Sequence, residues 1–244
     1  MGVTCLILGK SGSGKSTSLR NFGEGEVGIF NVAGKPLPFR NRLASYNLKR
    51  AKVNAYGAIE QSLAKNNMRA YVIDDANYLM AFQNFALADV KGYDKFTQMA
   101  VNFEHMLEVA AQTDDDTIVY VMMHPDYDDV GNMKPKTIGK MLDNQLTVEG
   151  MFPICLVAEH DQDGYCFMTE EAGTPAKAPM GMFGETVRLD NDLKAVDDAI
   201  REYWGMGPIK APEKKEPKKD KVRVIGGKDE QARFDHGETP QPRR

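Results

Sequence analysis

A short run of glycine, serine and lysine near the start of the chain has the spacing of a phosphate-binding loop. The run Gly9-Lys10-Ser11-Gly12-Ser13-Gly14-Lys15-Ser16-Thr17 matches the pattern G-x-x-x-x-G-K-[ST]. Its glycines let the backbone curl so that amide N–H groups point at phosphate oxygens, and the helix expected after it adds a positive end. Lys15 would bridge the β- and γ-phosphate oxygens, and the Ser16 hydroxyl would ligate Mg²⁺. The motif predicts ATP and Mg²⁺ as cofactors, the alternative being a Gly/Ser loop with an incidental lysine.

Two adjacent aspartates follow an apolar run at residues 70–73. A buried strand that ends in an acid places that acid at the carboxyl edge of a sheet, where ligands bind in folds of this kind. We assign Asp74 to the Mg²⁺ shell through water. Asp75 is the candidate base that orients the attacking water, and its alternative role is that of an N-cap for the segment starting at Ala76. No glutamate occupies the position, and a shorter acid indicates slow turnover.

A histidine follows another apolar run, at residues 117–123. His124 precedes Pro125, which disfavours helix at that point, so we expect it at the end of a strand. There its side chain could sense the γ-phosphate of a nucleotide. The alternative is a purely structural histidine.

Alternating strand and helix patterns surround these residues and predict an α/β fold with a mainly parallel sheet flanked by helices. Strands are expected at 3–8, 27–32, 70–73, 117–123 and 151–159, with a hairpin returning through 165–169. Helices are expected at 15–22, 55–66, 78–112 with a break at Gly92, and 192–204. Residues 35–52 show no regular pattern.

Composition divides the chain into a folded part and a tail. We expect one domain over residues 1–207, and a disordered, charged, Lys/Pro-rich tail over 208–244, which has five prolines and few large apolar residues. The apolar run at 3–8 is far shorter than the ~20 residues that cross a bilayer, and no charged segment precedes it. We therefore expect a cytoplasmic protein with no membrane contact.

The formal net charge of −4 hides an uneven distribution. Residues 1–69 carry 11 basic and 3 acidic side chains, residues 70–207 carry 9 and 25, and residues 208–244 carry 11 and 7. The basic first block includes a segment in which cations alternate with Phe39 and Tyr46, an arrangement suited to a flexible single strand of nucleic acid. The predicted single-stranded DNA contacts in it are Lys35, Arg40, Arg42, Lys49, Arg50 and Lys52. The alternative is a solvated face.

Several segments together resemble phage nucleotide-binding proteins, which are RecA-like P-loop ATPases related to single-strand annealing and recombination proteins. The resemblance spans roughly residues 3–204 and is carried by the phosphate-binding loop, the segment 34–39, the acids Asp74 and Asp75, the stretch 134–143, and Met180-Gly181-Met182-Phe183 with Asn191-Asp192-Leu193. It implies a RecA-like fold with Lys15, Ser16 and Asp74 at the nucleotide.

The resemblance also implies a mobile loop at residues 134–140, near DNA or a neighbouring subunit. The loop carries three lysines: two precede a helix start expected at Thr137, and one follows it. In a ring or filament, one lysine could reach the neighbour's γ-phosphate as an arginine finger does. We assign Lys140 to that role, and Lys134 and Lys136 to DNA; a solvated surface loop is the alternative.

One departure from the RecA-like pattern concerns a glutamate that often follows the second strand. Here the sequence is Asn31-Val32-Ala33-Gly34-Lys35. This departure argues against strong DNA-stimulated hydrolysis and shifts the role of base to Asp75.

The leading expectation is an ATP-binding, ATP-hydrolysing phage recombination or replication protein that acts on single-stranded DNA as a homo-oligomer. One alternative is a small-molecule kinase that phosphorylates a nucleoside or nucleotide. Another is an ATP-switched adaptor whose tail contacts a single-strand-binding protein or other replication protein.

Overall fold

The computed structural model describes residues 1–40, 42–49 and 54–209, with all their side chains except those of residues 143 and 144. These residues belong to one packed unit. Ile209, two residues beyond the expected end of the domain, is buried among apolar side chains. The expected tail, from 210 onward, lies outside the described residues.

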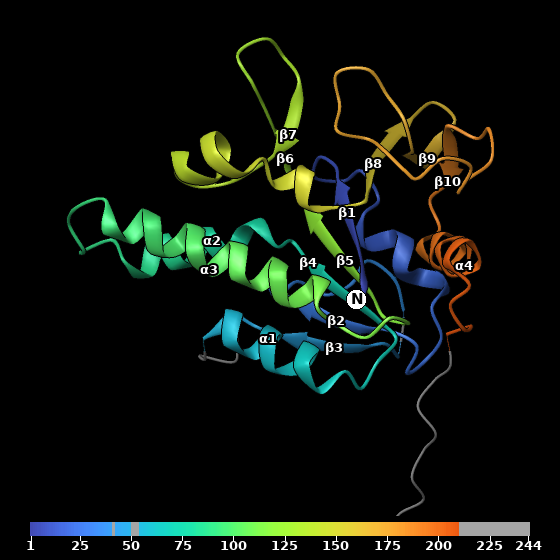
Figure 1. The fold of residues 1–244 in the computed structure, drawn as a ribbon, viewed down its shortest axis with the longest axis horizontal. Helices are drawn as coiled ribbons and strands as arrows, with labels where there is room; N and C mark the ends of the chain where they lie inside the picture. Colours follow the sequence, from blue (N-terminus) through green and yellow to red (C-terminus); the bar gives the residue numbers. More distant parts are fainter. Residues whose placement is uncertain (41, 50–53, 210–244) are drawn as a thin grey trace, which may run out of the picture. The chain divides into compact units, whose positions relative to one another are not determined.

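An eight-stranded sheet forms the centre of this unit (Figure 1). Six neighbouring strands are parallel to one another. At one edge the sheet continues through two antiparallel pairings, each with β9 as a member. From one edge to the other, the strands are β10 (Arg188–Asp190), β9 (Gly164–Met168), β8 (Ile154–Asp161), β1 (Val3–Leu8), β5 (Ile118–Met123), β4 (Ala70–Asp74), β2 (Gly28–Asn31) and β3 (Ala44–Asn47). The fold is therefore α/β with a mainly parallel sheet, and β8 and β9 form the expected hairpin.

Helices cover both faces of the sheet (Figure 1). On one face, α1 (Ala55–Lys65), α2 (Asn77–Ala86) and α3 (Asp94–Ala111) bury Ile59, Met80 and Phe103 against the strands. On the other, the 3₁₀ helix η1 (Ser16–Asn21) and α4 (Leu193–Trp204) bury Leu19 and Ile200. β1, β4 and β5 are buried along their whole length, which is why their sequences are continuous apolar runs rather than alternating ones.

The order of the strands creates a crevice at the carboxyl end of β1 and β5. β1 and β5 are neighbours in the sheet. From β1 the chain crosses to β2, on the β5 side of β1, whereas from β5 it crosses in the opposite direction to β8, on the far side of β1. Such a reversal of direction opens a crevice at the carboxyl ends of the strands, where ligands bind in open α/β sheets.

Three local features differ from the sequence-based expectations. The helix expected at 15–22 is the six-residue 3₁₀ helix η1. β3 was not expected, because its exposed sequence has no apolar alternation; its parallel pairing with β2 holds it in the sheet. β8 begins at Ile154 rather than at residue 151, because the short helix η3 (Val148–Met151) and Pro153 precede it.

Shorter elements fill the connection between β5 and β8. β6 (Pro125–Tyr127) and β7 (Met133–Pro135) form a small antiparallel ribbon, and the π-helical turn η2 (Leu142–Leu146) follows. The helix start expected at Thr137 is wrong. Gly139, at φ +94°, intervenes, and the helical turn begins at Lys140.

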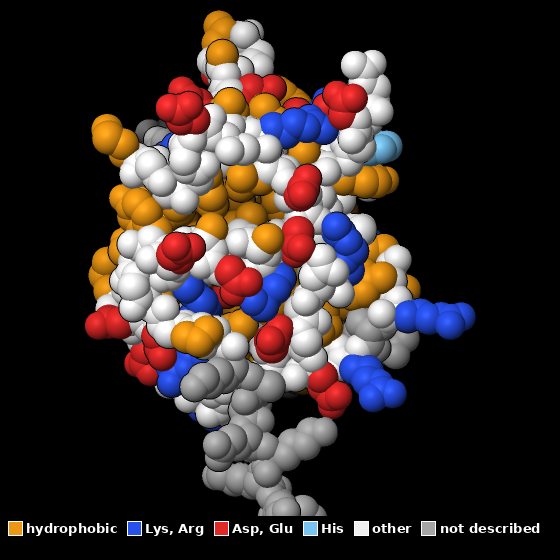
Figure 2. Space-filling view, turned by 90° about the vertical axis from the view of Figure 1, so that its right-hand side faces the viewer, with side chains coloured by type: hydrophobic (Ala, Val, Ile, Leu, Met, Phe, Trp, Pro, Cys, Tyr) orange, Lys and Arg blue, Asp and Glu red, His pale blue; other side chains and the backbone are white. Residues whose placement is uncertain are grey.

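Figure 2 shows the face of the unit that α4 covers. Acidic and basic side chains are interspersed there rather than gathered by sign. One such pair joins Lys194 to Asp198 along the exposed side of α4. Among the helices of the described residues, none has the length and apolarity needed to cross a membrane.

Candidate functional site

The loop between β1 and η1 curls at the crevice end of the sheet, as its glycines predict. Gly12 and Gly14 have φ angles of +82° and +92°, which a residue with a side chain adopts only with strain. Gly9 has no room for a side chain, because an added Cβ would lie 2.3 Å from Ser13 Oγ and 2.7 Å from the Ala158 carbonyl oxygen. The loop needs glycine at these places for geometric reasons.

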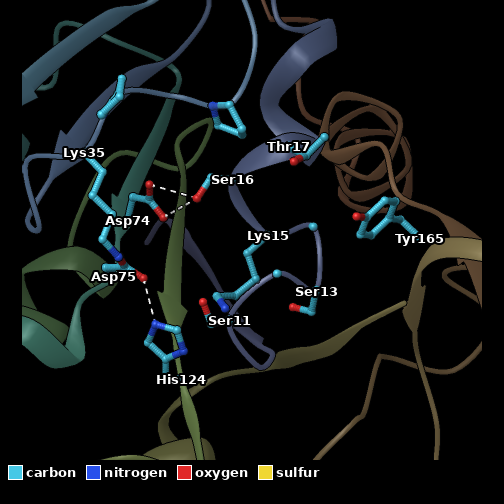
Figure 3. Close-up of a pocket in the computed structure, with 14 residues that line it drawn as sticks. Ser11, Ser13, Lys15, Ser16, Thr17, Lys35, Asp74, Asp75, His124 and Tyr165 are labelled. Atoms are coloured by element: carbon cyan, nitrogen blue, oxygen red, sulfur yellow. Dashed lines mark hydrogen bonds and ion pairs between the residues drawn. The ribbon is translucent and has the colours of Figure 1, made fainter. Parts of the chain in front are cut away.

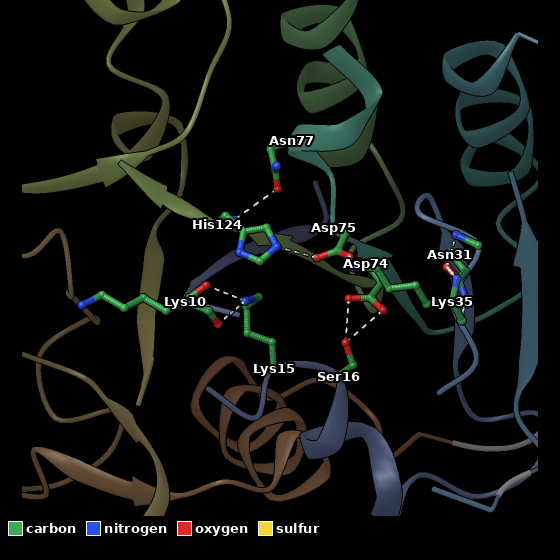
Figure 4. Close-up of polar contacts among 11 residues, drawn as sticks. Lys10, Lys15, Ser16, Asn31, Lys35, Asp74, Asp75, Asn77 and His124 are labelled. Carbon is green, nitrogen blue, oxygen red and sulfur yellow. Dashed lines mark hydrogen bonds and ion pairs between the residues drawn. The ribbon is translucent and has the colours of Figure 1, made fainter. Parts of the chain in front are cut away.

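Lys15 lies inside this loop with only 6% of its surface exposed. Its ammonium donates hydrogen bonds to the carbonyl oxygens of Gly9 and Lys10, the latter at 3.0 Å (Figure 4). Burial lowers the pKa of Lys15, and the charges of Asp75 and Asp74 oppose that shift. A buried cation is therefore fixed at the mouth of the loop.

Ser16 and Asp74 meet across the crevice, as expected for a magnesium site. Ser16 Oγ lies 3.1 Å from each carboxylate oxygen of Asp74 (Figure 3). Burial, and then the charge of Asp75, raise the pKa of Asp74 to about 6, against the opposing effects of Ser16 and the nearby lysines. A hydroxyl and a buried carboxylate side by side are the hard oxygen donors that Mg²⁺ prefers.

The donor set fits a magnesium ion that takes its remaining ligands from water and phosphate, as is usual for this ion. Among the described residues, no three His, Cys, Asp or Glu side chains gather where they could hold a metal by themselves. Ser16 and Asp74 are thus the two protein ligands that the site could supply.

Asp75 has a left-handed backbone conformation, with φ +61°, which is uncommon for a residue with a side chain. Its side chain makes no helix-capping hydrogen bond, since α2 begins after Ala76 without a side-chain cap. The N-cap alternative is therefore wrong. The carboxylate instead contacts the Lys35 ammonium at 3.1 Å and the His124 ring at 3.2 Å (Figure 3).

These two contacts dominate the electrostatics of Asp75. Burial raises its pKa, but His124 and Lys35 outweigh burial and hold the pKa below the usual value for an aspartate. At neutral pH Asp75 is consequently an anion between two side chains that can carry positive charge.

His124 is held at the end of β5 by α2. Its backbone N–H donates a 3.1 Å hydrogen bond to Asn77 Oδ1 (Figure 4). Its ring meets the Tyr78 ring edge to face at a centroid distance of 5.9 Å. Nε2 lies 3.2 Å from Asp75 Oδ1. The ring is thus oriented structurally and also faces the cleft, so the two roles considered for it are compatible.

Lys35 belongs to the cleft, although the sequence assigned it to a DNA surface. Asn31, the last residue of β2, fixes the backbone at this point: its Oδ1 accepts hydrogen bonds from Gly34 N at 2.7 Å and Lys35 N at 3.2 Å. Asn31 Nδ2 donates to the Lys35 carbonyl oxygen (Figure 4). Sequence reasoning missed Asn31. The signal that could have found it is its place at the end of β2, where it pairs in register with Asp74 at the end of β4.

The cleft enclosed by these groups has a volume of about 380 Å³ (Figure 3). Its lining comprises the loop residues Ser11, Gly12, Ser13, Gly14, Lys15, Ser16 and Thr17 together with Lys35, Pro36, Pro38, Asp74, Asp75, His124 and Tyr165. Gly9 and Lys10 line the adjoining hollow beside the hairpin of β8 and β9. This size is within the range of small-molecule sites.

Tyr165, on β9, is a second residue that sequence reasoning missed. It packs against the phosphate-binding loop so closely that a Cβ on Gly14 would lie 2.8 Å from its Cδ1. Its ring stacks on the ring of His160 with a centroid distance of 3.9 Å and an interplanar angle of 15°. The exposed Tyr165 lines the cleft while His160 lines the adjoining hollow, so the stacked rings separate the two.

The other predicted DNA contacts of the first block lie near the β3 edge. Arg40, Arg42 and Lys49 are exposed, and the Lys49 ammonium sits 5.4 Å from the centroid of the Phe82 ring. Tyr46, on β3, is half exposed. Arg50 and Lys52 lie outside the described residues.

The three lysines after β6 have different local surroundings. Lys134 lies on β7, opposite Asp126 of β6. Lys136 borders a hollow of about 530 Å³ that also touches Lys10, Ser11 and His124. Lys140 is exposed at the start of the helical turn before η2, and its predicted contact with a neighbouring subunit stays a prediction.

A comparison with known proteins adds no relative. No family model matches the chain, and no curated protein matches it.

Proposed function

We propose that the protein is a RecA-like P-loop ATPase that binds MgATP in the cleft at the end of β1, hydrolyses it, and acts on single-stranded DNA in phage recombination or replication. One observation carries the nucleotide site: the phosphate-binding loop ends at Ser16, whose hydroxyl faces the Asp74 carboxylate at 3.1 Å. A phosphate cradle beside a pair of oxygen donors is the arrangement that MgATP requires.

The polarity of the cleft supports an orientation for the nucleotide. Lys35, Asp75 and His124 lie on one side of the cleft and Thr17 and Tyr165 on the other, with Lys15 between them (Figure 3). The charged end suits the γ-phosphate, and the aromatic end suits the base. Because Tyr165 has His160 stacked behind it, its ring is a preformed surface for stacking a base.

Each residue then has a stated part in the reaction. Lys15 binds phosphate oxygens, Ser16 and Asp74 hold the magnesium ion, and the ion neutralises phosphate charge when bound. Asp75 orients the attacking water and accepts its proton, while His124 holds the Asp75 carboxylate toward the γ-phosphate end.

Single-stranded DNA binding is supported by a basic and aromatic surface near β3. Arg40 and Arg42, which precede β3, and Lys49, which follows it, are exposed, and Tyr46 on β3 is half exposed. Cations that track phosphates and a ring available for stacking suit single strands. A homo-oligomer would present several such surfaces along one strand, with Lys134, Lys136 and Lys140 near the DNA or the next subunit.

Nucleotide binding and hydrolysis test the first part of the proposal. The wild-type protein should bind a fluorescent MgATP analogue and release inorganic phosphate, Lys15→Ala should lose both, and Lys65→Ala, an exposed lysine on α1, should retain both. A wild-type protein that binds no nucleotide would overturn the proposal.

A kinase acting on a nucleoside or nucleotide is the second candidate. The observation that favours it is the hollow of about 530 Å³ that adjoins the nucleotide cleft at Ser11 and His124 and could take an acceptor. Phosphate release to water, measured against transfer to a panel of nucleosides and nucleotides, separates the two activities.

A further inference from the structure

Lys35 is joined to Asp75 in a way that contributes little to stability. The Lys35 side chain is 62% exposed, whereas that of Asp75 is 12% exposed, and their charged atoms are 3.1 Å apart. Because the ammonium is open to water, the attraction is screened, and the pair stabilises the fold less than a fully buried pair would. The position of the lysine therefore calls for another explanation.

The backbone of Lys35 is fixed by Asn31, whereas its ammonium contacts Asp75 and lies 5.3 Å from the centroid of the Tyr78 ring. The side-chain amide of Asn31 accepts hydrogen bonds from the N–H groups of Gly34 and Lys35 and donates one to the Lys35 carbonyl oxygen. Gly34 makes the turn with φ +69°. The four-carbon side chain extends from this anchor into the cleft toward Asp75 (Figure 4). A fixed backbone and a largely exposed four-carbon side chain leave the ammonium able to reach a second partner in the cleft.

Positive charge converges at this end of the cleft. Lys15 and Lys35 both line it, and the charge of Lys35 is close enough to lower the pKa of Lys15 and of Asp74. A dense anion such as the γ-phosphate would be the natural partner for two ammonium groups that face the same space.

We propose that Lys35 is a catalytic cation supplied within the same chain, which moves from Asp75 to the γ-phosphate when ATP binds and so frees Asp75 to act as the base. The inference rests on the proposed nucleotide site. It assigns to a residue of the same subunit the charge that the loop at Lys140 was expected to supply from a neighbour.

In the hydrolysis step, the oxygen of a water molecule forms a bond to the γ-phosphorus while the water gives one proton to the Asp75 carboxylate. The bond from the γ-phosphorus to the bridging oxygen breaks, and its electron pair leaves with ADP. Lys35 stabilises the negative charge of the equatorial γ-oxygens during the transfer. Asp75 afterwards releases its proton to solvent and regains Lys35 when phosphate leaves.

The test compares Lys35→Met with Lys35→Arg, which keeps the charge, and with Lys65→Met, a matched surface lysine on α1. For each full-length variant, the dissociation constants of MgATP and MgADP and the single-turnover rate of phosphate release are measured. Lys35→Met should weaken MgATP binding about 10-fold. It should leave MgADP binding unchanged and slow phosphate release roughly 100-fold or more. Lys35→Arg should stay within about 10-fold of the wild-type rate, and Lys65→Met should match the wild type.

Three outcomes would contradict the inference. Lys35→Met could hydrolyse ATP at the wild-type rate, or weaken ATP and ADP equally, or lose single-stranded DNA affinity while keeping its preference for ATP over ADP. In each of these cases the wild type still binds ATP, so the proposed function survives. A wild type that binds neither nucleotide overturns the proposed function as well.

Discussion

The hydroxyl of Ser16 lies equally far, 3.1 Å, from both carboxylate oxygens of Asp74, a residue 58 positions away in the sequence. Ser16 begins η1, after the loop that follows β1, and Asp74 ends β4; β5 lies between β1 and β4 in the sheet. His124, directly after β5, lies next to Asp75. The segments that follow three neighbouring strands thus assemble one polar cleft.

Asp74 should lower the stability of the folded protein at neutral pH, although it is needed to bind magnesium. Because the Asp74 pKa is raised to about 6, the folded state binds a proton more tightly than the unfolded chain does, and stability from this group falls as pH rises through 4 to 6. Asp74→Asn should therefore raise the free energy of unfolding at pH 7.5 by about 1–3 kcal/mol. It should also abolish the effect of Mg²⁺ on ATP affinity. Urea unfolding and ATP titrations with and without Mg²⁺ measure both, and a destabilised variant would contradict the assignment.

MgATP binding should depend on pH through the same carboxylate. Protonated Asp74 is a poor magnesium ligand, so between pH 7.5 and pH 5 the affinity for MgATP should fall about tenfold. ATP without Mg²⁺ and the Asp74→Asn variant serve as controls and should not show this fall. An affinity for MgATP that is flat across this range would exclude Asp74 from the metal site.

Tyr165 should contribute to binding of the base and not of the phosphates. Tyr165→Ala should weaken ATP binding about tenfold, while leaving the affinity for tripolyphosphate unchanged. Tyr165→Phe keeps the ring and should bind ATP like the wild type, as should Tyr93→Ala, which removes an exposed ring elsewhere. Equal losses for ATP and tripolyphosphate would mean that Tyr165 only supports the loop at Gly14.

Arg201 should be the most costly charge to remove from the fold. Its guanidinium is buried, pairs with the buried Asp197, and donates to the carbonyl oxygens of Asp116 and Arg69, while Tyr120 donates to the same carboxylate. Arg201→Met leaves the buried Asp197 carboxylate without its cation, while burial raises the pKa of Asp197, and should cost about 3–5 kcal/mol.

The exposed pair on the same helix provides the control for that measurement. Lys194→Met removes the cation facing Asp198 and should cost less than about 1 kcal/mol. Guanidinium unfolding of both variants measures the contrast. If both variants lost a similar free energy of unfolding, burial would not be what makes the Arg201–Asp197 pair costly to break.

The surface near β3 should bind single-stranded DNA through phosphate contacts. The double variant Arg40→Ala/Arg42→Ala should weaken binding and reduce the slope of log affinity against log salt by about 1–1.5. Anisotropy of a labelled oligonucleotide across a salt series measures the slope. Lys65→Ala/Lys91→Ala removes two exposed lysines elsewhere, and an equal effect of that pair would point to nonspecific charge alone.

The curled glycine-rich loop after β1, the acid at Asp74 and the strands that precede them could be predicted from the sequence, because each depends on a local pattern. Continuous apolar runs indicated buried parallel strands, and the position of the glycines indicated a loop that must curl. The break at Gly92 between α2 and α3 and the helix start at Asp192 likewise depend on neighbouring residues, and the structure confirms both.

The partners of Asp75 were decided only by the tertiary structure. Lys35 reads as one of several cations in a basic segment, and what brings it to Asp75 is the parallel pairing of β2 with β4 and the hold of Asn31 on the following turn. Tyr165 reaches the loop at Gly14 only because the hairpin of β8 and β9 pairs beside β1. Contacts between distant segments depend on strand order and register, which local residue patterns do not encode. The curled loop and the strand-end acids were therefore predictable from the sequence, while their arrangement around the cleft was not.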